Sequence, residues 1–161
     1  MGAPMQHPLV SECVKGDPAA LVFLHDIASI LHTWDDLIDR DTTVSDDEIS
    51  TAFLRALVTL PTNSFYMQHQ AKLLPILVIA IVNWQAANQL ERSEERTTDD
   101  QIIAFIIRST YVDLLTMSAV IVGGVVWAGS KVVEIRRWAH SEGYEGYVKN
   151  LAVERQIRED L

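Results

Sequence analysis

Three aspartates near the end of one helical segment constrain this 161-residue chain more than any other feature. Asp35, Asp36 and Asp39 follow Trp34 in a D-D-x-x-D pattern, and residues 19–40 carry unbroken helical periodicity. Asp35 and Asp39 therefore lie one turn apart on one face, with Asp36 beside them. Like charges at this spacing repel by roughly a few tenths of a kcal/mol per pair, and near a helix C-terminus they also oppose the helix dipole. Such a cluster is either exposed to water or neutralised by a cation.

Asp35 lies on the apolar side of this helix. Its helical phase places it beside Ala28 and Leu31 rather than on the polar face. A carboxylate among apolar side chains is costly unless it is paired, protonated or bound to a metal. Two interpretations stay open. The partner is Mg²⁺, which takes oxygen ligands and keeps water or phosphate oxygens, or it is an arginine such as Arg40 or Arg108.

The boundary signals along the chain are almost all helical. Asp17-Pro18 is an N-cap followed by proline at the first helical position. Two capping boxes follow, one over Ser45–Glu48 and one over Thr98–Gln101. Together with the apolar periodicity, these signals predict helices over residues 19–40, 45–60, 67–92 and 101–129, and a weaker helical region from 130 to 161.

The sequence thus predicts an all-α fold, a single-domain bundle of about five helices over residues 1–161. No alternation of polar and apolar residues supports a strand, and the short connections favour antiparallel neighbours. Residues 1–16 are expected to form an irregular N-terminal tail. Residues 61–66 are expected to form a turn, and Pro75 to kink the third helix or mark its start.

Composition and charge limit the classes of partner and the cellular setting. A hydrophobic content of 48% with 22% charged residues is typical of a globular protein. The formal net charge of −9, with no basic stripe, argues against nucleic acid as a partner. A single cysteine, Cys13, excludes an internal disulfide, and the first residues lack the pattern of a signal peptide. We therefore expect a cytoplasmic protein.

Two apolar runs are shorter than the length that a membrane-spanning helix needs. Residues 73–82 are too few, and residues 114–129 approach but do not reach the roughly 20 apolar residues of a spanning helix. We expect a buried helix over residues 114–129 and no membrane span. Gly123-Gly124 would permit close helix packing. The apolar stretch over 101–128 is more than one small domain can cover, which predicts a homo-oligomer.

The segment Trp34-Asp35-Asp36-Leu37-Ile38-Asp39 resembles the first aspartate-rich motif of class I isoprenoid synthases, the terpene cyclases and prenyltransferases. A second motif of the cyclases is matched at Asn83 and Glu91, whereas Ala87 stands at its middle position. The resemblance implies an all-α fold with Mg²⁺ held by five side chains and a small-molecule, prenyl-like diphosphate as substrate. The implied metal ligands are Asp35, Asp36, Asp39, Asn83 and Glu91. Turnover would be a metal-dependent lyase or transferase reaction.

Arg108 follows the almost wholly apolar run 102–107. A guanidinium in such surroundings needs a carboxylate or phosphate partner. It therefore pairs with Asp113 or with the aspartate cluster, or it contacts the substrate diphosphate.

Three further interpretations stay open. His25-Asp26 is similar to the core of HD-type phosphohydrolases, which need further His and Asp ligands. The acid pairs Asp36-x-x-Asp39 and Glu91-x-x-Glu94 are of the kind used by all-α nucleotide pyrophosphatases, which hydrolyse diphosphates with Mg²⁺. The third interpretation is a non-enzymatic helical scaffold or oligomerisation protein whose aspartates are only surface charges.

Overall fold

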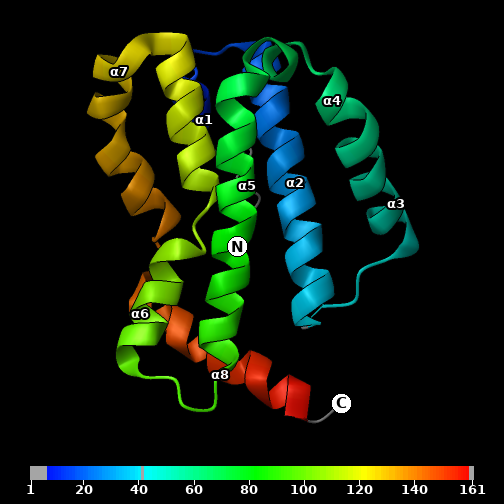
Figure 1. Ribbon diagram of the computed structural model, residues 1–161, viewed down its shortest axis with the longest axis vertical. Coiled ribbons are helices and arrows are strands. Elements are labelled where there is room, and N and C mark those ends of the chain that lie inside the picture. The colour runs from blue at the N-terminus through cyan, green and yellow to red at the C-terminus, as the bar shows by residue number, and fades with distance from the viewer. Residues whose placement is uncertain (1–6, 41, 160–161) are drawn as a thin grey trace.

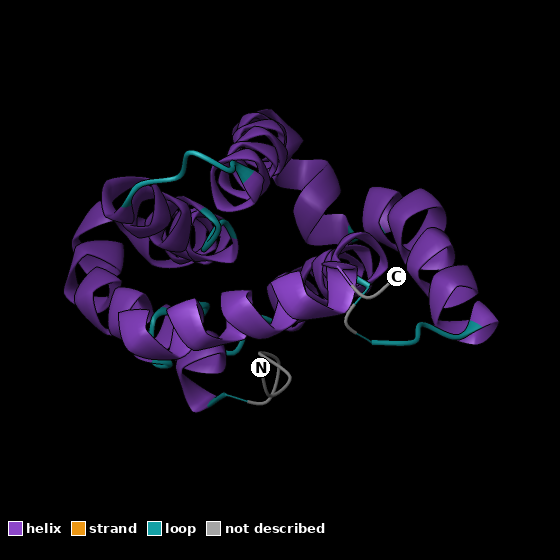
Figure 2. Ribbon diagram, turned by 90° about the horizontal axis from the view of Figure 1, so that it is seen from below, coloured by secondary structure: helices purple, strands orange, loops and turns teal. Residues whose placement is uncertain are grey.

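The computed structural model describes residues 7–40 and 42–159, with side chains up to residue 157, and over these residues it contains helices, turns and no strand (Figures 1 and 2). The chain is 85% helical, which confirms the predicted all-α fold. The elements, in chain order, are α1 (Pro8–Cys13), α2 (Pro18–Asp39), α3 (Asp46–Leu54), the π-helix η2 (Arg55–Thr59), α4 (Leu60–Thr62), α5 (Ser64–Arg92), α6 (Thr98–Ile107), α7 (Tyr111–Ala139) and α8 (Gly143–Glu159).

Helices α2 and α5 run side by side in the same direction, because α3, η2 and α4 return the chain along α2 before α5 begins (Figure 1). Helix α6 packs against α5, and α8 crosses the end of the molecule where α2 and α5 terminate (Figure 1). The C-terminal halves of α2 and α5 therefore meet at one end of the bundle. The aspartate pattern and Glu91 both lie on these halves.

Side-chain caps explain why several helices begin where they do. The Asp17 carboxylate accepts a bond of 2.8 Å from the backbone N–H of Ala20, as predicted for this N-cap. Ser45 and Glu48 form the predicted capping box at the start of α3. The box at α6 lies one residue earlier than predicted, because Thr97 is the N-cap and Asp100 completes the box.

The N-terminal segment is not wholly an irregular tail. Residues 8–13 form helix α1, and Leu9, Val10 and Cys13 are buried in the main core. The indole of Trp127 donates to the carbonyl oxygen of Cys13 at 2.9 Å and so ties α1 to α7. The prediction of a tail is therefore wrong for residues 8–13, since burial of their apolar side chains offsets the cost of ordering. Residues 1–6 lie outside the described part of the chain.

The connection between α3 and α5 is shorter than the predicted turn over 61–66. The helical path continues from α3 through η2 into α4, and Asn63 alone separates α4 from α5. The side chain of Asn63 accepts from the N–H of Tyr66 at 3.0 Å and thereby caps α5. Pro75 lies inside α5 rather than at its start.

Helix α7 is a hairpin of two helical arms rather than part of one long helix over 101–129. The chain leaves α6 at Ile107, re-enters a helix at Tyr111, and reverses direction at Gly124, which adopts φ 84° and ψ 170° (Figure 1). This backbone region is essentially restricted to glycine. The prediction that Gly123-Gly124 serves close packing is wrong for Gly124, which forms the turn of the hairpin. Gly123 does permit a close approach, because the Trp127 side chain occupies the space that a Cβ would need.

Two segments, Ser64–Arg92 and Thr98–Ala139, are long and apolar enough by length and composition to cross a membrane. The second is not one continuous helix, since it is interrupted between α6 and α7 and reverses at Gly124. The first is helix α5, which carries part of the site described below. The expected absence of a membrane span stays a prediction.

The apolar run over residues 73–82 of α5 is mostly exposed. Leu73 and Ala80 are buried, but five large apolar side chains of this run face outward: Leu74, Val78, Ile79, Ile81 and Val82. Helix α5 contacts the bundle along one face only, so the apolar side chains on its other faces are exposed. The predicted homo-oligomer stays a prediction, and this face is one that a second copy would cover.

The turn at Gly124 generates the first testable prediction. Gly124→Ala is expected to lower the free energy of unfolding by about 1–3 kcal/mol, because alanine is strained at this positive φ. Gly129→Ala is the matched control, since Gly129 lies in the second helical arm with open space around an added Cβ. The control should be neutral or stabilising by about 0.5–1 kcal/mol. Equal effects of the two changes in chemical denaturation would contradict the hairpin turn.

Candidate functional site

The guanidinium of Arg108 lies among three carboxylates where the ends of α2, α5 and α6 meet. Its Nη1 lies 2.8 Å from Oε1 of Glu91, and its Nη2 lies 3.2 Å from Oδ1 of Asp35 and 3.7 Å from Oδ2 of Asp39. The side chain of Arg108 is 19% exposed, and those of Asp39 and Glu91 are almost wholly buried. We call Asp35, Asp39, Glu91 and Arg108 the acid–arginine cluster.

Local sequence explains how these side chains come together. Asp35 and Asp39 lie one turn apart in the last turns of α2, and Glu91 lies in the last turn of α5. Because both helices end here, the negative ends of two helix dipoles add to the carboxylate charge. Arg108 is the C-cap of α6, which packs against α5 and carries the guanidinium into this negative region. Charge compensation at buried sites is what keeps such a cluster tolerable.

Three more side chains hold the carboxylates in place. Arg92 donates from Nη2 to Oδ1 of Asp39 at 3.0 Å, and the indole N–H of Trp84 donates to Oδ1 of Asp35 at 3.1 Å. The hydroxyl of Tyr147, from α8, donates to Oε1 of Glu91 at 2.6 Å. The sequence did not identify these three as site residues. Arg92 adjoins the predicted ligand Glu91, a signal that could have been used, but nothing local marks Tyr147.

Two of the predicted metal ligands lie outside the cluster. Asp36 faces His32 on the same helix, with 3.5 Å between Oδ2 and Nε2. Asn83 is half-buried, and no described hydrogen bond joins its side chain to a cluster carboxylate. The face of α5 that turns inward carries Trp84, Ala87 and Glu91, so Asn83 lies at its edge. The structure therefore brings together Asp35, Asp39, Glu91 and Arg108 of the predicted set.

Burial and charge act in opposite directions on these groups. Burial raises the pKa of Asp35, and the neighbouring Arg108 only partly offsets this. For Arg108, burial alone would lower the pKa, but Glu91, Asp35 and Asp39 together raise it above its usual range. Burial and the bond to Glu91 raise the pKa of Tyr147. Arg108 is therefore a permanent cation, and Tyr147 stays a neutral donor.

Within the described ranges, no three His, Cys, Asp or Glu side chains are grouped so as to hold a metal ion as they stand. The guanidinium of Arg108 itself lies between the carboxylates of Asp35, Asp39 and Glu91. A divalent cation binding to these three would take over the contacts that Arg108 makes here. Carboxylate oxygens are the donors that Mg²⁺ prefers.

The His25-Asp26 pair does not assemble the ligand set of a phosphohydrolase in the described structure. Asp26 is buried against Arg55, with 3.4 Å to its Nε, and accepts from the hydroxyl of Thr59 at 2.9 Å. The ring of His7, the only upstream histidine, lies against Trp138 with 5.4 Å between the ring centroids. Neither contact points to a shared metal.

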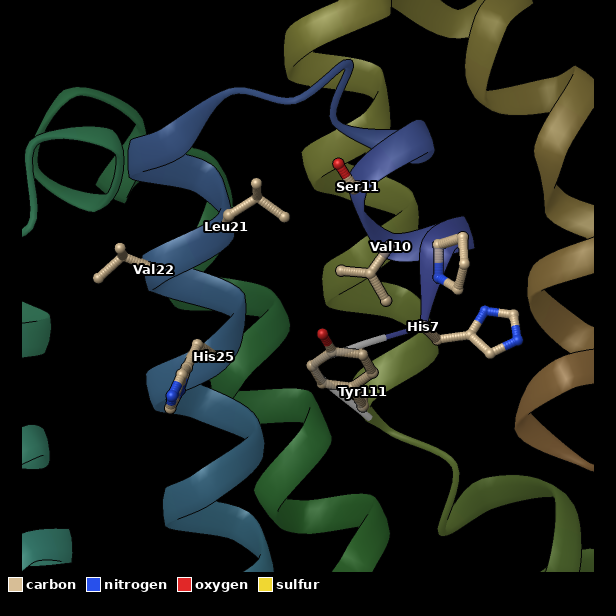
Figure 3. A pocket seen from close by; sticks show the side chains of 8 residues that line it. His7, Val10, Ser11, Leu21, Val22, His25 and Tyr111 are labelled. Carbon is tan, nitrogen blue, oxygen red and sulfur yellow. The ribbon is translucent and has the colours of Figure 1, made fainter. Parts of the chain in front are cut away.

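His25 instead lines a pocket of about 330 Å³ between α1, α2 and the start of α7 (Figure 3). Val10, Leu21 and Tyr111 also line it, and the Tyr111 hydroxyl points into the space between the helices (Figure 3). The Tyr111 hydroxyl and Nδ1 of His25 are buried without a hydrogen-bond partner in the described structure. Burial lowers the pKa of His25, so the imidazole is neutral near pH 7.

The acid pairs expected of a nucleotide pyrophosphatase do not converge. Glu94 lies exposed in the turn after α5, whereas Glu91 points into the bundle. Asp36 faces His32, away from the contact that Asp39 makes with Arg92. The arrangement of two paired acids on adjacent helices is therefore absent from these described residues.

The cluster predicts a large stability effect at Arg108. Arg108→Met leaves Glu91 and Asp39 buried without one of their cations, and is expected to lower the free energy of unfolding by about 3–5 kcal/mol. The matched control is Arg136→Met, which breaks an exposed pair with Asp113 and should cost less than about 1 kcal/mol. Adding Glu91→Gln to Arg108→Met should recover part of the loss. Similar losses for both arginines in chemical denaturation would refute the buried cluster.

The pKa of Asp35 gives a prediction about pH. Because the folded-state pKa is raised above the ordinary value of 3.8, this group favours folding at low pH, and the benefit is lost as pH rises through the folded pKa. Asp35→Asn should therefore match the wild type near about pH 3.5 and become the more stable protein as pH rises above 3.8. The difference should be small, since the Asp35 side chain is 37% exposed. A wild type that is more stable at pH 7 would show that the bond to Arg108 outweighs burial.

Protein-family models, curated proteins and solved structures were compared with this chain, and none of them matches it. The function is therefore argued from the geometry and chemistry of the cluster.

Proposed function

We propose that the acid–arginine cluster binds Mg²⁺ together with a small molecule that carries a diphosphate. One observation carries the proposal: three carboxylates from two helices, Asp35, Asp39 and Glu91, are held around a single cation. This is the set that the resemblance to isoprenoid synthases and the helical spacing favour, without Asp36 and Asn83. The cation at the centre is a side chain, so it can be exchanged.

An exchange of partners follows from the charges. The three carboxylates face the guanidiniums of Arg108 and Arg92, and Asp39 contacts both of them. A divalent cation bound to the carboxylates would free both guanidiniums to donate to phosphate oxygens. Arginine suits this role because its planar donors match phosphate in a bidentate manner. Arg108 thus neutralises the acids before the ligand binds and holds the diphosphate afterwards.

The surroundings support turnover of such a ligand. When bound, Mg²⁺ would stabilise the negative charge on a departing diphosphate. Arg108 and Arg92 would hold that diphosphate, and Tyr147 would fix the orientation of Glu91 through its 2.6 Å bond. The reaction class is then loss or transfer of the group attached to the diphosphate.

A purely structural role is the second candidate, and one observation favours it. Each carboxylate of the cluster already has a protein partner in the described structure: Asp35 has Trp84 and Arg108, Asp39 has Arg92, and Glu91 has Tyr147. Such a network could serve only to join α2, α5, α6 and α8 in a helical scaffold. Metal binding separates the two candidates.

The proposal predicts cooperative binding of Mg²⁺ and inorganic pyrophosphate. Both together should raise the melting temperature, because a ligand that binds only the folded state adds about 2.7 kcal/mol of stability at a hundred times its Kd. Asp35→Asn combined with Asp39→Asn should abolish the rise. Arg108→Lys should weaken the binding of pyrophosphate more than that of Mg²⁺, because lysine keeps the charge but loses the bidentate geometry.

Asp113→Asn is the matched control, since Asp113 forms an exposed pair far from α2 and α5 in the sequence. It should leave the melting response unchanged. If titration calorimetry detects no heat from Mg²⁺ with pyrophosphate, the structural role is the correct one.

A further inference from the structure

A groove of about 830 Å³ lies directly beside the acid–arginine cluster. Trp34 and Ile38 of α2 form one side, and Trp84, Arg92 and three carboxamide side chains of α5 form the other. This volume is in the range of small-molecule sites. The groove is open to solvent rather than enclosed, and it has room for the organic part of a ligand whose diphosphate occupies the cluster.

Two side chains belong to both the groove and the cluster. Trp84 lines the groove while its indole N–H donates to Asp35 at 3.1 Å. Arg92 lines the groove while its Nη2 bonds to Asp39 at 3.0 Å. A ligand held at the cluster would thus have its next atoms at Trp84 and Arg92.

The groove offers an aromatic surface. The rings of Trp34 and Trp84 are in contact, with 4.1 Å between centroids and 35° between planes. Trp84 is buried and fixed by Asp35, whereas Trp34 is half-buried and lines the open groove. Any flat heteroaromatic ring can stack on such a surface, because every nucleobase has a π-face.

The carboxamides add hydrogen-bonding groups that a hydrocarbon ligand cannot use. The Asn88 residue is only 6% exposed, and it lines the groove between Trp84 and Arg92 on α5. Gln85 and Gln89 lie exposed at the rim of the same groove. A carboxamide presents a donor and an acceptor side by side, which matches the paired groups on the edge of a nucleobase. A prenyl chain would leave the Asn88 carboxamide without a partner.

We infer that the ligand class of this site is nucleoside diphosphates, with the base on Trp34, its edge at Asn88 and its diphosphate at the acid–arginine cluster. This inference rests on the proposed function, because the cluster must hold the diphosphate. The carboxamides distinguish the nucleoside from the prenyl group that the sequence resemblance implies.

The test is titration calorimetry of the full chain with Mg²⁺ and three kinds of ligand. These are inorganic pyrophosphate, the four common ribonucleoside diphosphates, and geranyl diphosphate. At least one nucleoside diphosphate should bind about tenfold or more tightly than pyrophosphate, because stacking of the base adds to the binding free energy. Geranyl diphosphate should also be compared with pyrophosphate, and its increase in affinity should be smaller than that of the nucleotide.

Variants locate the gain in the groove. Trp34→Leu should lower the affinity for the nucleoside diphosphate by a much larger factor than the affinity for pyrophosphate. Because Trp34 contacts Trp84 and its loss could disturb folding, the double change of Gln85 and Gln89 to alanine is the second variant. It alters exposed side chains only and should reduce discrimination among the four bases. Gln68 and Gln70, exposed near the other end of α5, changed together to alanine are the matched control.

The outcomes separate the two proposals. If pyrophosphate binds with Mg²⁺ but no nucleoside diphosphate binds more tightly, the nucleoside inference is wrong and the proposed function stands. Tighter binding of geranyl diphosphate than of every nucleotide would likewise overturn the nucleoside inference alone. If no compound binds, the proposed function fails, and the inference fails with it.

Discussion

The balance of charge around Arg108 is the constraint on which the rest of this structure depends. Two parallel helices, α2 and α5, end at the same place, and each ends with acidic side chains. Without a cation, the negative ends of the two helix dipoles and the carboxylates would repel one another there. Arg108 supplies it from the end of α6, and Tyr147 of α8 attaches to the same network through Glu91. Four helices are therefore joined at one cation, which explains why α6 and α8 gather at this end of the bundle.

Structural features that depend on residues a few positions apart could be predicted from the sequence. The caps at Asp17 and Ser45 depend on residues three positions away, and both are present as expected. The convergence of Glu91 with the aspartates followed from helical phase and a short connection. Arg108 was limited to a carboxylate or phosphate partner by the apolar run before it. Each of these inferences needed only local geometry or the cost of an unpaired charge.

Features set by long-range packing could not be predicted in this way. The reversal at Gly124 looks in sequence like a glycine pair inside an apolar helix. Only the packing of the arms of α7 against α1 and α5 decides between a continuous helix and a turn. Helix α1 is too short for helical periodicity, so its burial against α7 gives no local signal. Asn83 was expected to join the cluster, but the inner face of α5 is offset from it by one residue at Trp84. A shift of one position on a helix moves a side chain by roughly 100° and out of the site.

The hairpin made by the reversal at Gly124 also has closely spaced ends. Ser109 and His140, just outside α7, meet with 3.1 Å between Oγ and Nε2, and Phe105 packs edge-on against the His140 imidazole. The chain thus leaves the acid–arginine cluster after Arg108 and returns to nearly the same point before α8 begins. The base of the hairpin is therefore held at the charged end, while its tip is held to α1 by the bond from Trp127 to Cys13. The N-terminal helix is in this way connected through one hairpin to the end of the bundle that carries the cluster.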